Sequence, residues 1–331
     1  MAGVRLTRRG IGPPLGGMKA MLWAGLCTAL VAVGLAAEAG DAAAVYRAEI
    51  AAAREARVAQ LTRPDGWLAY LGTHTLDSGA NSIGRSPGSR VRLEAGPAQL
   101  GTLTVAGEGR TTFTFAPGVS GEIDGVPLRR GELKPGRDTG GGSVVTVGAL
   151  GFFVLDRGGG QRALRAWDGE APRRKDFAGI DYFPTDPAWR VQARWEAFET
   201  ARFMPIPNIA GQTVRVIVPG RAVFERDGQR YELLAIDEGG GGPLLFVIAD
   251  ATSGKETYGA CRFVYAERPR AVDTSEAGGA GEAVTIILDF NRAENPPCAF
   301  TPLAVCPLPP KENRLTLAVT AGEKVYRGAH E

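Results

Sequence analysis

Polar side chains that could do chemistry follow two apolar segments of this chain, residues 244–248 and 283–288. They include carboxylates, which can act as general bases, and arginines, which can hold an anionic or carbonyl group. If the two segments are neighbouring strands, Arg262 could form an ion pair with either Asp250 or Asp289. The candidate polar site therefore consists of Asp250, Thr252, Thr257, Tyr258, Arg262, Asp289, Asn291, Arg292, Asn295 and Asn313.

Two interpretations of this polar set remain open. In the first, the side chains form a structural network, because buried charges need partners and stiff loops need side-chain donors. In the second, Asp250 or Asp289 is a general base, and Arg262 or Arg292 holds the substrate. A cleft around these residues would favour the second interpretation, and a packed interior would favour the first.

The segment from Asp289 to Leu315 is rich in proline and contains two cysteines. Proline removes a backbone donor and fixes φ, so this segment is predicted to be a shaped loop rather than a helix or a central strand. Cys298 and Cys306 are close enough in sequence to form a disulfide in an oxidising compartment, and the alternative is two reduced, buried thiols. Cys261 is predicted to be a buried free thiol.

Other catalytic and metal-binding arrangements find little support in the sequence. The chain has two histidines, His74 and His330, and no spacing typical of a zinc or calcium site. His74 is interpreted as a half-buried strand residue rather than a catalytic base. The glycine runs at 140–142 and 239–242 lack the lysine and helix of a phosphate-binding loop. We therefore predict neither a cofactor nor a metal, and whether the protein is an enzyme stays open.

The N-terminus is typical of a signal peptide, predicted to be residues 1–39. Basic residues precede an uncharged apolar run at 20–37, and small residues follow it. The alternative is a retained membrane anchor, because 18 apolar residues just reach a spanning length. We expect cleavage, export to the periplasm or the medium, and no stable membrane span in the mature chain.

The charge balance excludes a strongly basic protein. The chain has 38 basic and 36 acidic residues, and removal of residues 1–39 takes away four basic residues and one acidic residue, leaving 34 against 35. A nearly neutral mature chain gives no sign of a nucleic-acid partner. The expected partner is an unknown small molecule or a component of the cell envelope.

Composition and pattern predict a mainly β protein with one N-terminal helix at residues 41–61. The chain has 46 glycines and 22 prolines, and short apolar runs alternate with turn residues. Asp227-Gly228 is a preferred two-residue hairpin turn. A β-sandwich is predicted at 67–167, and a second antiparallel β domain, which includes the Pro/Cys-rich loop, at 177–324.

The first β half resembles forkhead-associated domains. The similarity is carried by the turn at Ile83-Gly84-Arg85-Ser86 and by the segments 123–128, 133–138 and 145–148. The resemblance implies a sandwich architecture. The serine and histidine that read phosphothreonine have no counterpart in residues 94–99, so the phosphopeptide activity is not carried over.

Most of the mature chain, from about Trp67 to Lys324, resembles the bacterial family called domain of unknown function 1684. The similarity is carried by the segments 64–72, 179–189 and 250–265 and by DFNRAENPPCAFTPLAVCPLPP, which begins at Asp289. Cys261 departs from the family pattern, in which a glycine is expected. The resemblance implies no activity. The leading hypothesis is a non-catalytic binding or interaction module of the cell envelope, and the alternative is a metal-independent hydrolase that uses Asp250/Asp289 with Arg262/Arg292.

Overall fold

The structure is a computed structural model that describes residues 41–137, 141–273 and 282–328. The predicted signal peptide lies outside these residues. The chain divides into two compact units, Met1–Glu49 and Ile50–Glu331. The fold is mainly β with an N-terminal helix and several antiparallel sheets, which confirms the predicted fold class.

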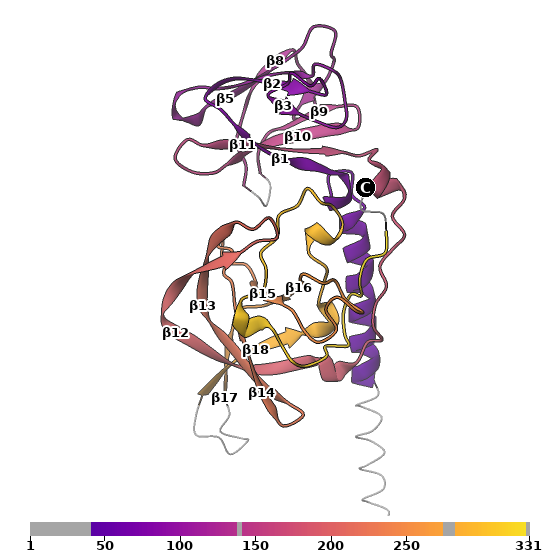
Figure 1. The fold of residues 1–331 in the computed structure, drawn as a ribbon, viewed down its shortest axis with the longest axis vertical. Helices are drawn as coiled ribbons and strands as arrows, with labels where there is room; N and C mark the ends of the chain where they lie inside the picture. The colour runs from indigo at the N-terminus through magenta and orange to yellow at the C-terminus, as the bar shows by residue number, and fades with distance from the viewer. Residues whose placement is uncertain (1–40, 138–140, 274–281, 329–331) are drawn as a thin grey trace, which may run out of the picture. The chain divides into compact units, whose positions relative to one another are not determined.

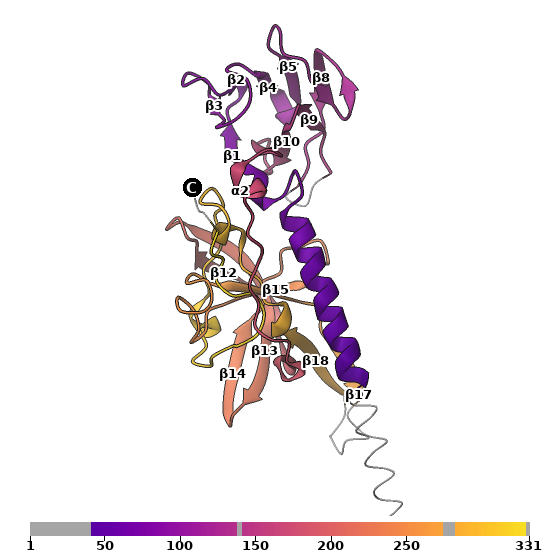
Figure 2. The same cartoon turned by 90° about the vertical axis from the view of Figure 1, so that its right-hand side faces the viewer.

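Residues 41–61 are helical, as predicted. In the second unit, Ile50 and Leu61 on this helix are fully buried, and Arg54 donates a hydrogen bond to the carbonyl oxygen of Phe183. Residues 50–61 run beside the C-terminal β part, as Figure 2 shows. Among the described residues, no helix has both the length and the apolar character needed to span a membrane.

The first β part is a sandwich of two sheets that share one apolar core (Figure 1). Its centre is built from aromatic and aliphatic side chains such as Phe113 and Phe152, whose rings meet edge to face. Asp168, where the last strand ends, precedes the short helix α2 (Pro172–Lys175). One sheet has the order β1 (Tyr70–Leu76), β11 (Arg162–Asp168), β10 (Leu150–Asp156), β9 (Val144–Val147), β6 (Glu122–Ile123) and β7 (Val126–Pro127), and the other has the order β3 (Val91–Arg92), β2 (Gly79–Gly84), β4 (Gly101–Val105), β5 (Thr111–Phe115) and β8 (Arg130–Leu133).

The second β part contains a five-stranded sheet and a separate two-stranded sheet. Apart from Tyr265, the strands β15 and β16 are buried on both faces, because one face packs against the large sheet and the other against the Pro/Cys-rich loop. The large sheet has the order β14 (Gln229–Leu234), β13 (Thr213–Arg226), β12 (Arg190–Pro207), β18 (Glu282–Asp289) and β17 (Arg270–Asp273), and the hairpin consists of β15 (Leu244–Ile248) and β16 (Arg262–Ala266).

The turn between β13 and β14 has the predicted geometry. Asp227 and Gly228 both have positive φ, 51° and 72°, as this type of two-residue hairpin turn requires. The first strand of this hairpin, β13 (Thr213–Arg226), is continuous. Pro219-Gly220 does not end it, because the backbone continues through both residues along β12.

The chain after β18 has no long strand in its described residues, as the proline content predicts. It makes three single turns of 3-10 helix, η5 (Phe290–Arg292), η6 (Pro297–Ala299) and η7 (Lys311–Asn313). Further 3-10 turns occur at η1 (Trp67–Ala69), η2 (Gly107–Gly109) and η3 (Pro187–Trp189). These turns place polar side chains at fixed positions without a β ladder.

Candidate functional site

The predicted polar set separates into two places. Asp250 and Arg262 form a buried ion pair, with 2.8 Å between Nη2 of Arg262 and Oδ2 of Asp250. Arg262 also donates to the carbonyl oxygens of Val319 and Ala321. Asp250 accepts hydrogen bonds from the backbone and hydroxyl of Thr252. Arg262 is 1% exposed, so this part of the set lies in a packed interior.

The possible pairing of Arg262 with Asp289 is wrong. Asp289 ends β18, which belongs to the large sheet, whereas Arg262 begins β16 in the two-stranded sheet. Asp289 instead lies 3.4 Å from Arg292 and accepts a hydrogen bond from the backbone of Asn291. Burial lowers the pKa of Arg262, and the carboxylate of Asp250 opposes this effect. The Asp250–Arg262 pair therefore serves to fix the segment around residues 319–323.

Four further residues of the predicted set, Asn313, Asn295, Tyr258 and Thr257, are also structural. The amide of Asn313 bonds to both backbone groups of Leu234, and that of Asn295 donates to the carbonyl oxygen of Lys324. The phenol of Tyr258 donates to the carbonyl oxygen of Cys298. The Thr257 hydroxyl lies 2.9 Å from that of Thr252.

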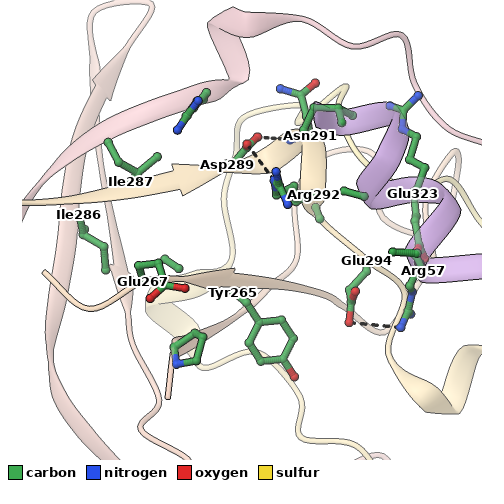
Figure 3. Close-up of a pocket in the computed structure, with 18 of the residues that line it drawn as sticks. Arg57, Tyr265, Glu267, Ile286, Ile287, Asp289, Asn291, Arg292, Glu294 and Glu323 are labelled. Atoms are coloured by element: carbon green, nitrogen blue, oxygen red, sulfur yellow. Dashed lines mark hydrogen bonds and ion pairs between the residues drawn. The ribbon is translucent and has the colours of Figure 1, made fainter. Parts of the chain in front are cut away.

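The remaining three residues of the predicted set line a cavity of about 790 Å³, drawn in Figure 3. This volume is within the range of small-molecule sites. Asp289, Asn291 and Arg292 lie along its wall, at the end of β18. We call it the arginine-lined cavity, because its lining includes Arg54, Arg57, Arg190, Arg268, Arg270 and Arg292, against four acidic residues, Glu267, Asp289, Glu294 and Glu323.

The strongest electrostatic feature of the cavity was not predicted from the sequence. Arg57, on the N-terminal helix, contacts two carboxylates, Glu323 at 3.0 Å and Glu294 at 3.4 Å. Figure 3 shows Arg57, Glu294 and Glu323 together at one end of the cavity. Burial opposes the positive charge on Arg57, but Glu323 and Glu294 outweigh this effect and raise its pKa.

Glu294 has the chemistry of a group that exchanges a proton near neutral pH. Burial raises its pKa to about 7, the charge of Glu323 adds to the increase, and Arg57 opposes it. Burial also raises the pKa of Glu323, which Arg57 and the backbone N–H of Asn295 counteract. A carboxyl group with a strongly shifted pKa in a cavity is a common mark of a functional site.

Backbone contacts hold Glu294 in place. Its N–H and C=O exchange two hydrogen bonds with Phe263 of β16, and the neighbouring carbonyl of Ala293 accepts from Glu323. The backbone at Gly322 lies close to that at Ala293. Gly322 has φ +78°, and the carbonyl oxygen of Ala293 is only 2.5 Å from where a Cβ of residue 322 would lie. Glycine at 322 therefore allows Glu323 to reach the cavity.

The cysteines are free thiols throughout the described residues. Cys261 is buried and free, as predicted. The predicted bridge between Cys298 and Cys306 is not formed in this structure, where the backbone N–H of Cys298 instead donates to Sγ of Cys306 over 3.3 Å. The two thiols are hydrogen-bonded neighbours, and the contact with Cys306 lowers the pKa of Cys298. The bridge stays a prediction.

In the part of the chain that the structure describes, no group of three His, Cys, Asp or Glu side chains could hold a metal ion. His74 is half-buried in β1, as the sequence indicated, and does not line the arginine-lined cavity.

The fold and the cavity define a β-rich protein with a cavity of small-molecule size. Comparisons with known proteins find a family whose model matches part of the chain. Residues 175–324 match the family described as protein of unknown function (DUF1684). The match covers the second β part but not the first, so it is narrower than the resemblance from about Trp67. The forkhead-associated resemblance and the bacterial origin stay predictions.

A solution NMR structure of an uncharacterized protein of Haloarcula marismortui is also similar to this chain. It is 33% identical, and the similar region covers 47% of this chain and 81% of that protein, with a TM-score of 0.37. No curated protein matches the chain.

Proposed function

We propose that this protein is an exported binding protein of the cell envelope that takes a small anionic molecule into the arginine-lined cavity. The observation that carries the proposal is the lining, in which six arginines face four acidic side chains in about 790 Å³. An excess of cations in a concave site attracts anions and holds oxyanions by charge-assisted hydrogen bonds.

The arginines differ in how free they are to meet a ligand. Arg268 is paired with Asp237, and Arg57 with two glutamates. Arg292 keeps 46% of its side chain exposed, and its contact with Asp289 is a long one of 3.4 Å. Arg270 is exposed on β17 at the same cavity. Arg292 and Arg270 are therefore two arginines that a ligand reaches without breaking a buried pair.

A second candidate function is a metal-independent enzyme, such as a hydrolase, in this same cavity. The original form of this alternative, with Asp250 and Arg262, loses support because both side chains are packed in the interior. Asp289 and Arg292 remain at the cavity, and Glu294, with its pKa of about 7, adds a suitable general acid or base. Turnover that is lost in Glu294→Gln would favour the enzyme, and saturable binding without turnover favours the binding protein.

The test is isothermal titration of the purified protein with sulfate and with acetate, at low ionic strength. We expect saturable binding of at least one anion, weakened several-fold or more in Arg292→Gln. The matched control is Arg230→Gln, since Arg230 is 50% exposed, also contacts carboxylates and does not line the cavity. Equal weakening by both substitutions, or no binding to the parent protein, would contradict the proposal.

Export is a separate part of the proposal and has its own test. N-terminal sequencing of the envelope fraction should give a chain that begins between about residues 40 and 45. Recovery of the intact chain from Met1 in the membrane fraction would instead support an N-terminal anchor.

A further inference from the structure

Arg57 is shared unequally between the two carboxylates of the arginine-lined cavity. Its Nε bonds to Oε1 of Glu323 at 3.0 Å, and its Nη2 donates to the carbonyl oxygen of Asn295 at 2.8 Å. The second oxygen of Glu323 accepts from the backbone of Asn295. Glu294 contacts Arg57 only through Nη1, with 3.4 Å between Nη1 and Oε1 of Glu294. Nη1 is thus the nitrogen of Arg57 that another anion could take with the least disruption.

The two glutamates also differ in exposure. The side chain of Glu323 is 1% exposed, whereas that of Glu294 is 26% exposed and borders the cavity. The groups that act on Glu294 come from four segments: Arg57 on the helix, Glu323 near the C-terminus, Tyr182 before η3, and Tyr265 on β16. Burial raises the pKa of both tyrosines, which keeps them neutral. A charged Glu294 therefore competes with Glu323 for one arginine.

We propose that an anionic ligand displaces Glu294 from Nη1 of Arg57, and that Glu294 then binds the ligand as a neutral carboxylic acid that donates a hydrogen bond. The inference rests on the proposed function and narrows the ligand to an oxyanion, either a carboxylate or a phosphate-like group, that is bound with uptake of a proton. The proton comes from solvent, and no covalent bond is made or broken. Oxyanions accept hydrogen bonds, so the protonated carboxyl suits them and the ionised carboxylate repels them.

The expected pH dependence follows from the fraction of Glu294 that carries a proton. With a pKa of about 7, roughly nine-tenths is protonated at pH 6 and one-tenth at pH 8. Apparent affinity scales with the competent fraction, so binding should weaken about tenfold between these two pH values.

The experiment measures the Kd of sulfate and acetate at pH 6 and pH 8, because both probes stay ionised over this range. We compare the parent protein with Glu294→Gln, which keeps a neutral donor, and with Glu267→Gln as a control that removes another acid lining the cavity. For each probe that binds, the parent and the control should lose about tenfold affinity at pH 8. Glu294→Gln should bind equally at both values and as tightly as the parent at pH 6.

A Glu294→Gln variant that keeps the tenfold pH dependence, or that binds more weakly than the parent at pH 6, would overturn the inference while leaving the proposed function intact. No binding of either probe at either pH would overturn both. If the variant does not fold, the test is calorimetric titration of the parent protein with the bound probe at pH 7.5, in two buffers of different ionisation enthalpy. Proton uptake on binding supports the inference, and its absence refutes it.

Discussion

Replacement of Arg262 by alanine should destabilise this protein more than any other single change at the predicted polar set. The side chain is 1% exposed and holds Asp250 at 2.8 Å, together with the carbonyl oxygens of Val319 and Ala321. Alanine leaves the carboxylate buried with the donors of Thr252 but without a countercharge, and it leaves the carbonyl oxygens unpaired. Breaking one side of a buried ion pair costs about 3–5 kcal/mol. That is a large fraction of the 5–15 kcal/mol that typically stabilises a domain.

The assay is urea unfolding of the purified variant beside the parent protein, followed by fluorescence and circular dichroism. The control is Arg292→Ala, because Arg292 is half exposed and its ion pair with Asp289 should contribute only about 0–1 kcal/mol. We expect the unfolding free energy to fall by several kcal/mol in Arg262→Ala and by less than about 1 kcal/mol in the control. A near-parental midpoint and slope for Arg262→Ala would refute the reasoning that this pair is structural.

Three further predictions concern the surroundings of the cavity. Gly322→Ala should destabilise the protein by roughly 1–3 kcal/mol and weaken anion binding, because the added Cβ would meet a backbone carbonyl. The control is Gly125→Ala, since Gly125 has a similar φ but open space around the Cβ position. In thermal unfolding, the control should show only the cost of the backbone strain. The pKa of Glu294, raised from 4.5 to about 7 in the folded state, means that the folded protein holds this proton more tightly than the unfolded chain does, so stability from this group is lost as pH rises from about 4.5 to 7. Glu294→Gln should therefore be more stable than the parent at pH 8, by up to about 3 kcal/mol in unfolding free energy, and as stable as the parent at pH 4. The same difference in unfolding free energy at both pH values would contradict this. Peptide mapping of the exported protein without reduction should find Cys298 linked to Cys306, and alkylation of either residue in the native, unreduced protein would rule the bridge out.

Some strands of the second β part could be predicted because they are apolar and end at strong turn signals. Residues 244–248 are the strand β15 with the predicted bounds, since five consecutive apolar residues leave little choice. The strand β12 was not predicted. Its 18 residues are mostly exposed or half-buried and carry many charges, so they show no clean alternation of apolar and polar side chains.

The candidate site was predicted in part, because its residues meet across very different sequence distances. Asp289, Asn291 and Arg292 follow one strand and could be selected from that pattern. Arg57 and Glu323 are 266 residues apart, and no local pattern connects them. Arg57 stands at helical spacing from the buried Ile50 and Leu61, but an arginine in an apolar stripe does not reveal which carboxylates it meets.

The choice between two partners for Arg262 also needed the structure. Both Asp250 and Asp289 follow apolar strands, so sequence position favours neither. The sheet topology decides, because β15 pairs with β16 and brings the residues after β15 next to Arg262, whereas β18 pairs with β12 and β17.

The central claim is that the arginine-lined cavity binds a small oxyanion, and the most direct measurement is anomalous diffraction from crystals soaked in selenate at pH 6. We expect a selenium peak inside the arginine-lined cavity, placed so that a selenate oxygen accepts a hydrogen bond from Nη1 of Arg57. Selenium peaks only outside the cavity, at a selenate concentration well above the Kd measured for sulfate, would contradict it.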